Sequence, residues 1–282
     1  MIQENLNIII IILLLNTAII YFHKILIKKF NIYDFPDKKR KFHESKTSLF
    51  GGSIVLINII FFTIIQLIQN HQNFFQTFYF YFFLGSLLFY LLGLVDDKKD
   101  INANIKFIIE FFIVSILIIA DKNLLIEKIY FQSFDKTIYL GKYSFIFTVL
   151  SIIIFINALN MYDGINLQVG SYCIIILLTL MYFSNLDLIL LILIMSLITF
   201  LYLNYKSIIF LGDSGTYLLG FIISYLIIYT AKIDNYYLLS ADKIFIIMLL
   251  PGLDLIRLFI IRLRNKKHPF SSDRNHVHHI IE

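Results

Sequence analysis

Long apolar runs, separated by short polar segments, repeat along the whole chain. Nine of these runs approach the roughly 20 residues that an α-helix needs to cross a bilayer. The predicted spans lie near residues 6–22, 51–69, 78–95, 104–120, 144–160, 167–184, 188–204, 215–231 and 244–261. The pattern therefore predicts an all-α polytopic integral membrane protein, built as a single domain over residues 1–282.

The composition strengthens this interpretation. Hydrophobic residues make up 59% of the chain and the mean hydropathy is +0.80, which excludes a water-soluble globular domain. The lone cysteine, Cys173, lies inside an apolar run, so an intrachain disulfide is excluded. The first span lacks basic residues before it and a small-residue cleavage site after it, so it is not a cleavable signal peptide.

The basic residues predict an orientation. Of the 24 Lys and Arg, 18 fall in one set of alternating polar segments, namely residues 23–50, 96–106, 205–214 and 257–282. Because cytoplasmic loops collect Lys and Arg, this set is predicted to be cytoplasmic, with the N-terminus outside and the C-terminus inside. The external loop 121–142 alternates weakly and predicts a small β-hairpin.

The fifth predicted span ends in a polar stripe. Asn157, Asn160 and Asp163 follow one another at spacings of three, so they share a face if the helix continues, and Gly164 can break it. Polar groups at a membrane boundary need water, a partner or a ligand. Asn160 and Asp163 carry the oxygen ligands that Mg²⁺ prefers, and a simple polar helix end is the alternative.

Two acids end the third predicted span, Asp96 and Asp97, where the helix dipole favours cations instead. They suit metal binding or proton abstraction from a phosphate. The alternative is a solvated loop start, with Lys98 and Lys99 as partners of the acids. Lys106, at the start of the next span, suits a lipid phosphate or simply extends to the membrane surface.

A third acidic segment, Gly212-Asp213-Ser214-Gly215, leads into the eighth predicted span. Asp213 or Ser214 is a candidate N-cap. A helix N-terminus flanked by glycines also suits phosphate oxygens, with Asp213 holding the bridging metal.

Two basic segments complete the predicted cytoplasmic clusters. Arg40 and His43 precede Gly51-Gly52 and suit either lipid headgroups in general or a phosphorylated lipid substrate. The C-terminal segment suits a nucleotide sugar, or a zinc ion as the alternative, through Arg274, His276, His278 and His279. Metal-binding acids, phosphate-binding cations and a membrane together favour phosphoryl transfer between a soluble diphosphate and a lipid phosphate.

These motifs resemble those of the polyprenyl-phosphate N-acetylhexosamine-1-phosphate transferases of bacterial envelope synthesis. The resemblance covers nearly the whole chain in five ordered motifs. They are Arg40-Lys-Phe-His43 with Gly51-Gly52; Asp96-Asp97 with Lys106; Asn157-x-x-Asn160-x-x-Asp163-Gly164; Phe210-Leu-Gly-Asp213-Ser-Gly; and Pro251-x-x-Asp254, Arg262 and the run from Pro269 to His279. The form of the last motif resembles the branch that uses UDP-GlcNAc and undecaprenyl phosphate.

The resemblance implies a Mg²⁺-dependent transferase, with Mn²⁺ as an alternative metal, whose active site faces the cytoplasm from the bacterial inner membrane. Its expected partners are a UDP-N-acetylhexosamine, a polyprenyl phosphate and the bilayer, with no nucleic acid, and a homodimer is one open oligomeric state. UMP is released in the first lipid-linked step of envelope polysaccharide synthesis.

The resemblance also implies roles for individual residues. Asp213 and Asn160 are expected to bind Mg²⁺, and Asp96 or Asp97 to deprotonate or orient the lipid phosphate. Asp163 is expected to act with the histidines in positioning the nucleotide sugar. The remaining substrate-binding residues are expected to be Lys106, Asn157, Arg40, His43, Arg274, His276, His278 and His279.

The sequence departs from the family pattern in several places. Asn166-Leu167 stands where the family continues with Asp-Gly, and Glu110 stands where a Gln is usual. The chain stops three residues after His279, which predicts a C-terminus shortened by at least one span. Two alternatives follow: a non-catalytic homologue of the same fold, and a transporter. The clustering of the acids at one surface argues against a transporter.

Overall fold

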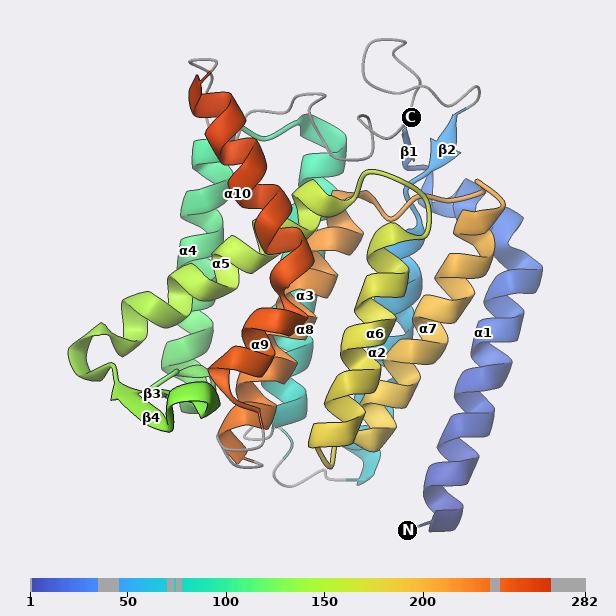
Figure 1. Ribbon diagram of the computed structural model, residues 1–282. Coiled ribbons are helices and arrows are strands. Elements are labelled where there is room, and N and C mark those ends of the chain that lie inside the picture. The colour runs from blue at the N-terminus through green and yellow to red at the C-terminus, as the bar shows by residue number, and fades with distance from the viewer. Residues whose placement is uncertain (1, 35–45, 70–73, 75–77, 234–238, 265–282) are drawn as a thin grey trace. The chain divides into compact units, whose positions relative to one another are not determined.

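The computed structural model describes residues 2–34, 46–69, 74, 78–233 and 239–264, with side chains from Leu6 onward. In this part of the chain most residues are helical (Figure 1). The ten α-helices are α1 (Ile2–Phe30), α2 (Gly51–Gln69), α3 (Phe78–Lys99), α4 (Ala103–Ala120), α5 (Ser144–Tyr162), α6 (Gln168–Phe183), α7 (Asp187–Tyr205), α8 (Gly212–Ile233), α9 (Ala241–Ile247) and α10 (Leu249–Arg264).

The all-α membrane architecture predicted from the sequence is confirmed. Within the described residues, seven helices are long and apolar enough to cross a bilayer, or eight if α9 and α10 form one bent span. Each of the nine predicted ranges overlaps a helix, but the count of nine spans is not confirmed. The reason is α6, which is apolar but only 16 residues long.

The last predicted span is broken. The helices α9 and α10 meet at Met248 with a bend of 69°. Pro251 lies in the first turn of α10, where a missing backbone N–H costs nothing but where the ring disfavours a continuous helix into the preceding turn. A hydropathy pattern does not register this bend, because the residues on both sides of it are apolar.

The chain divides into two compact units. The first comprises Met1–Asp100 and Asn166–Leu219, and the second comprises Ile101–Ile165 and Gly220–Glu282. In the first unit α7 packs against α1, α2 and α6 (Figure 1). Its core includes Ile54 and Val55 of α2 with Leu190 and Leu197 of α7, all fully buried.

A pair of buried amides joins α1 to α2 inside this core. Asn16 Nδ2 donates to Asn58 Oδ1 at 2.8 Å, and Asn58 Nδ2 donates back to Asn16 Oδ1 at 3.2 Å. Each amide also donates to a carbonyl four residues earlier, of Ile12 and Ile54 respectively. Paired amides of this kind hold helices together in lipid, where an unsatisfied polar group is costly.

The second unit contains the predicted hairpin. The strands β3 (Lys128–Phe131) and β4 (Lys136–Tyr139) pair antiparallel, with Lys128 opposite Tyr139, so this prediction is confirmed. Short 3₁₀ helices flank the strands: η2 (Lys122–Leu124), η3 (Gln132–Phe134) and η4 (Gly141–Tyr143). In the same unit α5 packs against both α4 and α10.

Candidate active site

In the first unit, the carboxylate of Asp97 closes the N-terminus of α8. Its Oδ1 accepts the backbone N–H of Asp213 at 2.8 Å, and its Oδ2 accepts the N–H of Ser214 at 3.0 Å. The first N–H groups of a helix have no partner within that helix, and the dipole there favours negative charge. Asp97 lies at the C-terminus of α3, where the dipole disfavours an acid, but it contacts the N-terminus of α8, where the dipole favours one.

This contact corrects two expectations. Asp213 or Ser214 was a candidate N-cap, yet the capping carboxylate belongs to Asp97, 116 residues earlier. The N-terminus of α8 was also predicted to suit phosphate oxygens, but two of its N–H groups already donate to Asp97. A cap from another helix leaves no local sequence pattern, so sequence reasoning could not find it.

Glycines let the backbones approach closely around Asp213. A Cβ added at Gly93 of α3 would lie 2.3 Å from the carbonyl oxygen of Asp213, and one at Gly52 would lie 2.6 Å from Cα of Gly215. Gly212 has a φ of +74°, which L side chains rarely adopt. Each of these positions therefore requires a residue without a side chain.

The segment before α2 is joined to the segment before α8. Two short strands, β1 (Tyr33–Asp34) and β2 (Thr47–Ser48), pair antiparallel. Phe210 N–H donates to the carbonyl of Ser48 at 2.8 Å, and Gly51 N–H donates to the carbonyl of Phe210 at 3.0 Å. These bonds fix the position of the Asp213 turn relative to α2.

The three acids of this region differ in exposure. Asp96 is only 2% exposed, whereas Asp97 and Asp213 are both half-buried. Both oxygens of Asp97 accept backbone N–H groups, so its observed role is to position Asp213. Asp213 is half-buried like Asp97, and its backbone is held by these bonds.

Asn166 and Leu167, which depart from the family pattern, are held in this unit by hydrogen bonds to the end of α7 and the segment after it. Asn204 is buried; its Oδ1 accepts the N–H of Leu167 at 2.7 Å and its Nδ2 donates to the carbonyl of Ile209 at 2.8 Å. Asn166 Nδ2 donates to Ser207 Oγ at 3.0 Å. Leu167 has a φ of +70°, a conformation in which a glycine would be less strained.

In the second unit, a buried carboxylate orients the first amide of the polar stripe. Asn157 Nδ2 donates to Glu110 Oε2 at 2.7 Å and to the carbonyl of Ile153 at 3.0 Å. These bonds use both N–H groups of the amide and leave Oδ1 as an acceptor. Glu110 is fully buried, and half-buried Lys106 lies one turn before it on α4. Sequence reasoning gave Glu110 no role, although an acid inside an apolar run is a recognisable signal.

The polar stripe is partly as predicted. Asn157 and Asn160 both lie on α5, but the helix ends at Tyr162, so Asp163 follows it as an exposed C-cap residue. Its N–H contacts the carbonyl of Asn160 at 3.4 Å. Asp163 therefore lies on a turn beyond the helix face that it was predicted to share.

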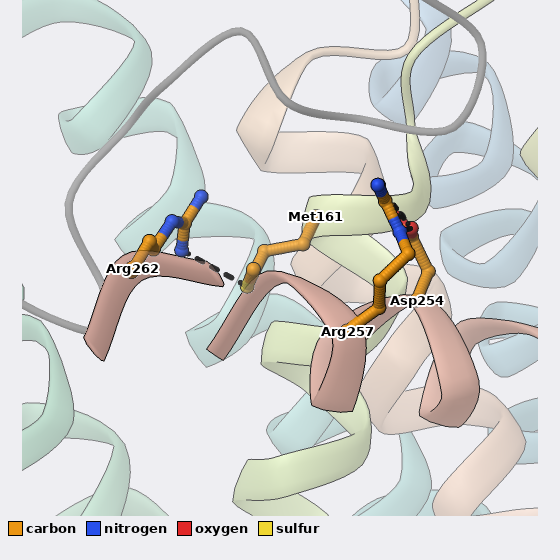
Figure 2. A network of polar contacts seen from close by, with 4 residues as sticks. All are labelled: Met161, Asp254, Arg257 and Arg262. Atoms are coloured by element: carbon orange, nitrogen blue, oxygen red, sulfur yellow. Dashed lines mark hydrogen bonds and ion pairs between the residues drawn. The ribbon is translucent and has the colours of Figure 1, made fainter. Parts of the chain in front are cut away.

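Basic side chains of α10 lie near the end of α5. Figure 2 shows Arg257 paired with Asp254 at 2.9 Å, and Arg262 with its Nη1 3.9 Å from Sδ of Met161. Asp254 is buried and Arg262 is only 2% exposed. Sequence reasoning singled out Asp254 and Arg262 but missed Arg257 and Met161.

The two expected metal ligands belong to different units, Asp213 to the first and Asn160 to the second. Asp213 and Asn160 offer oxygen atoms, which suit Mg²⁺. Among the described residues, no three or more His, Cys, Asp or Glu side chains gather closely enough to hold a metal ion. The remaining predicted site residues, Arg40, His43, Arg274, His276, His278 and His279, lie outside the described residues.

Comparison with known proteins identifies relatives along most of the chain. The model of glycosyl transferase family 4 matches residues 79–231. The undecaprenyl-phosphate alpha-N-acetylglucosaminyl 1-phosphate transferase of Escherichia coli K12 is 27% identical, over 96% of this chain and 74% of that protein. The Yersinia pestis protein of that name is 28% identical, over 90% and 70%. A probable undecaprenyl-phosphate N-acetylglucosaminyl 1-phosphate transferase of Bacillus subtilis is 29% identical, over 70% and 56%.

Proposed function

Because the chain belongs to glycosyl transferase family 4, we propose that it transfers a sugar 1-phosphate to a polyprenyl phosphate within the membrane. In the finer form of this proposal the donor is UDP-GlcNAc or a related UDP-N-acetylhexosamine, and the acceptor is undecaprenyl phosphate. The similarity to the Escherichia coli transferase over 96% of this chain carries the proposal.

The reaction exchanges one phosphorus–oxygen bond for another. An oxygen of the lipid phosphate attacks the β-phosphorus of the UDP-sugar, and the bond from that phosphorus to the bridging oxygen breaks. UMP leaves with the bridging oxygen, and a polyprenyl-diphosphate sugar remains. In phosphoryl transfer, catalysis comes mainly from positioning and from neutralising charge.

The geometry supports a division of labour among the acids. Asp97 holds the start of α8, so that the half-buried carboxylate of Asp213 is presented from a fixed backbone. We assign Asp213 as a ligand of Mg²⁺, which when bound would neutralise charge on the diphosphate. The assignment of Asn160 to the same ion, and of Asp96 to the lipid phosphate, stays a prediction.

In the second unit, Glu110 aims the acceptor oxygen of Asn157 by taking one N–H of its amide. An oriented amide oxygen suits a donor group of the substrate, such as a sugar hydroxyl or an amide N–H. In the same unit Arg257 is paired with Asp254 and Arg262 is buried, so neither is assigned to the substrate.

The test is UMP release by the purified full chain with undecaprenyl phosphate, Mg²⁺ and a panel of UDP-N-acetylhexosamines. We expect release with UDP-GlcNAc that is lost on chelation and in Asp213→Asn. Asp135→Asn is the matched control, because Asp135 is exposed on the hairpin in a left-handed conformation that Asn also accepts. UMP release with a different UDP-sugar, and not with UDP-GlcNAc, would keep the transferase assignment and change only the assigned donor. Absence of release from a cooperatively melting sample would contradict the transferase and favour a non-catalytic homologue.

A further inference from the structure

The second unit contains a half-open cavity of about 270 Å³. Its walls come from four elements: β3 of the hairpin, the first half of α5, the second half of α8, and α9. The walls are mostly hydrocarbon, as the side chains of Ile129, Phe147, Ile152, Ile227, Phe245 and Met248 illustrate.

The chemistry of the walls favours an apolar guest over water. A buried water needs two to four polar partners, and an apolar cavity of about 150 Å³ stays dry while accepting a hydrocarbon guest. Few polar residues line this larger cavity, and the hydroxyl of one of them, Ser151, already donates to the carbonyl of Phe147 at 2.8 Å. A hydrocarbon chain is therefore the guest that fits.

Polar bonds around the cavity hold its walls together. Asp242 Oδ2 of α9 accepts the N–H of Gln132 at 2.6 Å and the N–H of Ser133 at 3.3 Å, which ties α9 to the hairpin. Lys232 Nζ at the end of α8 donates to the carbonyl of Lys122 at 2.7 Å. These bonds join the elements that form the walls, and they do not occupy the cavity itself.

The cavity is separate from the polar end of α5. Ser151, in its wall, lies nine residues before Asn160, which at 1.5 Å per residue is about 13 Å along the helix. Two lysines, Lys128 and Lys232, are among the lining residues. A chain with a negatively charged head group matches both the apolar walls and these cations.

We propose that the cavity holds an acyl chain of a membrane glycerophospholipid, with the anionic head group against Lys128 and Lys232. The tail of a polyprenyl phosphate is a poorer match. In the proposed reaction the phosphate of that lipid lies at the opposite end of α5. The part of it that reached the cavity would be hydrocarbon, with no charge to pair with Lys128 and Lys232. The apolar walls and the two lysines stand without the proposed function, whereas the ranking of the polyprenyl tail below the phospholipid rests on it.

The experiment uses phosphatidylglycerol with a photoactivatable diazirine on one acyl chain, added to the detergent-solubilised full chain. We expect mass spectrometry to find label on peptides that contain residues 147–152, 224–232 and 241–248. Ala231→Leu fills the cavity and should lower this labelling roughly tenfold, since displaced methylenes lose their apolar contacts. Ala120→Leu, at the exposed end of α4, is the matched control.

A second pair of variants tests the head group. Lys128→Gln should lower the labelling several-fold, while Lys136→Gln, exposed on the partner strand, should not. If Ala231→Leu reduces the yield of folded protein, Ser151→Leu fills the same space from α5. Labelling that no filling variant lowers would overturn the proposal. So would label that undecaprenyl phosphate displaces where unlabelled phosphatidylglycerol does not, because the cavity would then belong to the carrier.

Discussion

Replacing Gly93 by alanine tests whether α3 positions the Asp213 turn. The added Cβ would lie 2.3 Å from the carbonyl oxygen of Asp213 and 2.5 Å from Cα of Ser214. Carbon–oxygen contacts normally begin near 3.3 Å, so one backbone must move by about 1 Å. The obstacle is backbone on both sides, and a change of rotamer therefore cannot relieve it.

The size of the effect follows from this displacement. Overpacking of this kind costs about 1–3 kcal/mol. The Asp97 bonds, at 2.8 and 3.0 Å, would stretch toward the limit at which a hydrogen bond is lost. A misplacement of about 1 Å at a catalytic group can cost about 100-fold in rate. We therefore expect Gly93→Ala to lower both the thermal midpoint and, about 100-fold, the rate of UMP release.

Gly252→Ala on α10 is the matched control, because an added Cβ there meets nothing within 4 Å. Both variants are measured for UMP release at saturating substrate and for thermal melting by circular dichroism. If Gly93→Ala kept the turnover and the midpoint of the unsubstituted chain, the close approach of α3 to the Asp213 turn would not matter. The positioning argument would then be refuted.

Three further predictions concern individual contacts and are checked by thermal melting. Asp97→Asn leaves one side-chain oxygen for two backbone N–H groups, so we expect the free energy of unfolding to fall by about 1–3 kcal/mol. An unchanged thermal midpoint would contradict the capping role of Asp97. Glu110→Leu and Asn157→Leu should together cost less than the sum of their separate effects, by about 0.5 kcal/mol or more, and additivity would argue against their contact. Leu167→Gly should leave the midpoint equal or higher while Leu167→Val lowers it, because of the φ of +70°; equal losses would speak against strain there.

The hydropathy pattern predicted helices well where polar residues mark both ends. The range 51–69 matches α2 at both bounds, since Gly51-Gly52 begin the helix and polar residues follow it. The bounds were less close where contacts with distant residues determine the end of a helix. The helix α8 begins at Gly212 and not at residue 215, because Asp97 satisfies its first N–H groups.

At the candidate site, too, the sequence predicted what depends on neighbouring residues and missed what depends on distant ones. Residue types and spacing singled out Asp96, Asp97 and Asp213 as candidates, and the structure places Asp97 against the backbone of Asp213. Residue types and spacing did not separate the roles, because which carboxylate caps a helix depends on a contact 116 residues apart along the chain. The partner of Asn157 was missed for the same reason: Glu110 lies 47 residues earlier, on another helix.

The Asp97 cap also has a consequence for biosynthesis. At synthesis rates of about 5–20 residues per second, the 116 residues that separate Asp97 from Asp213 take about 6–23 s to make. Through that interval α3 carries an acid whose final partners do not yet exist, with Lys98 and Lys99 beside it as the available counter-charges. The Asp97 carboxylate has therefore been synthesised before the N–H groups of α8 that it accepts. Docking of α8 against α3 is thus an event late in assembly, and before it the Asp213 turn has no cap to hold its backbone.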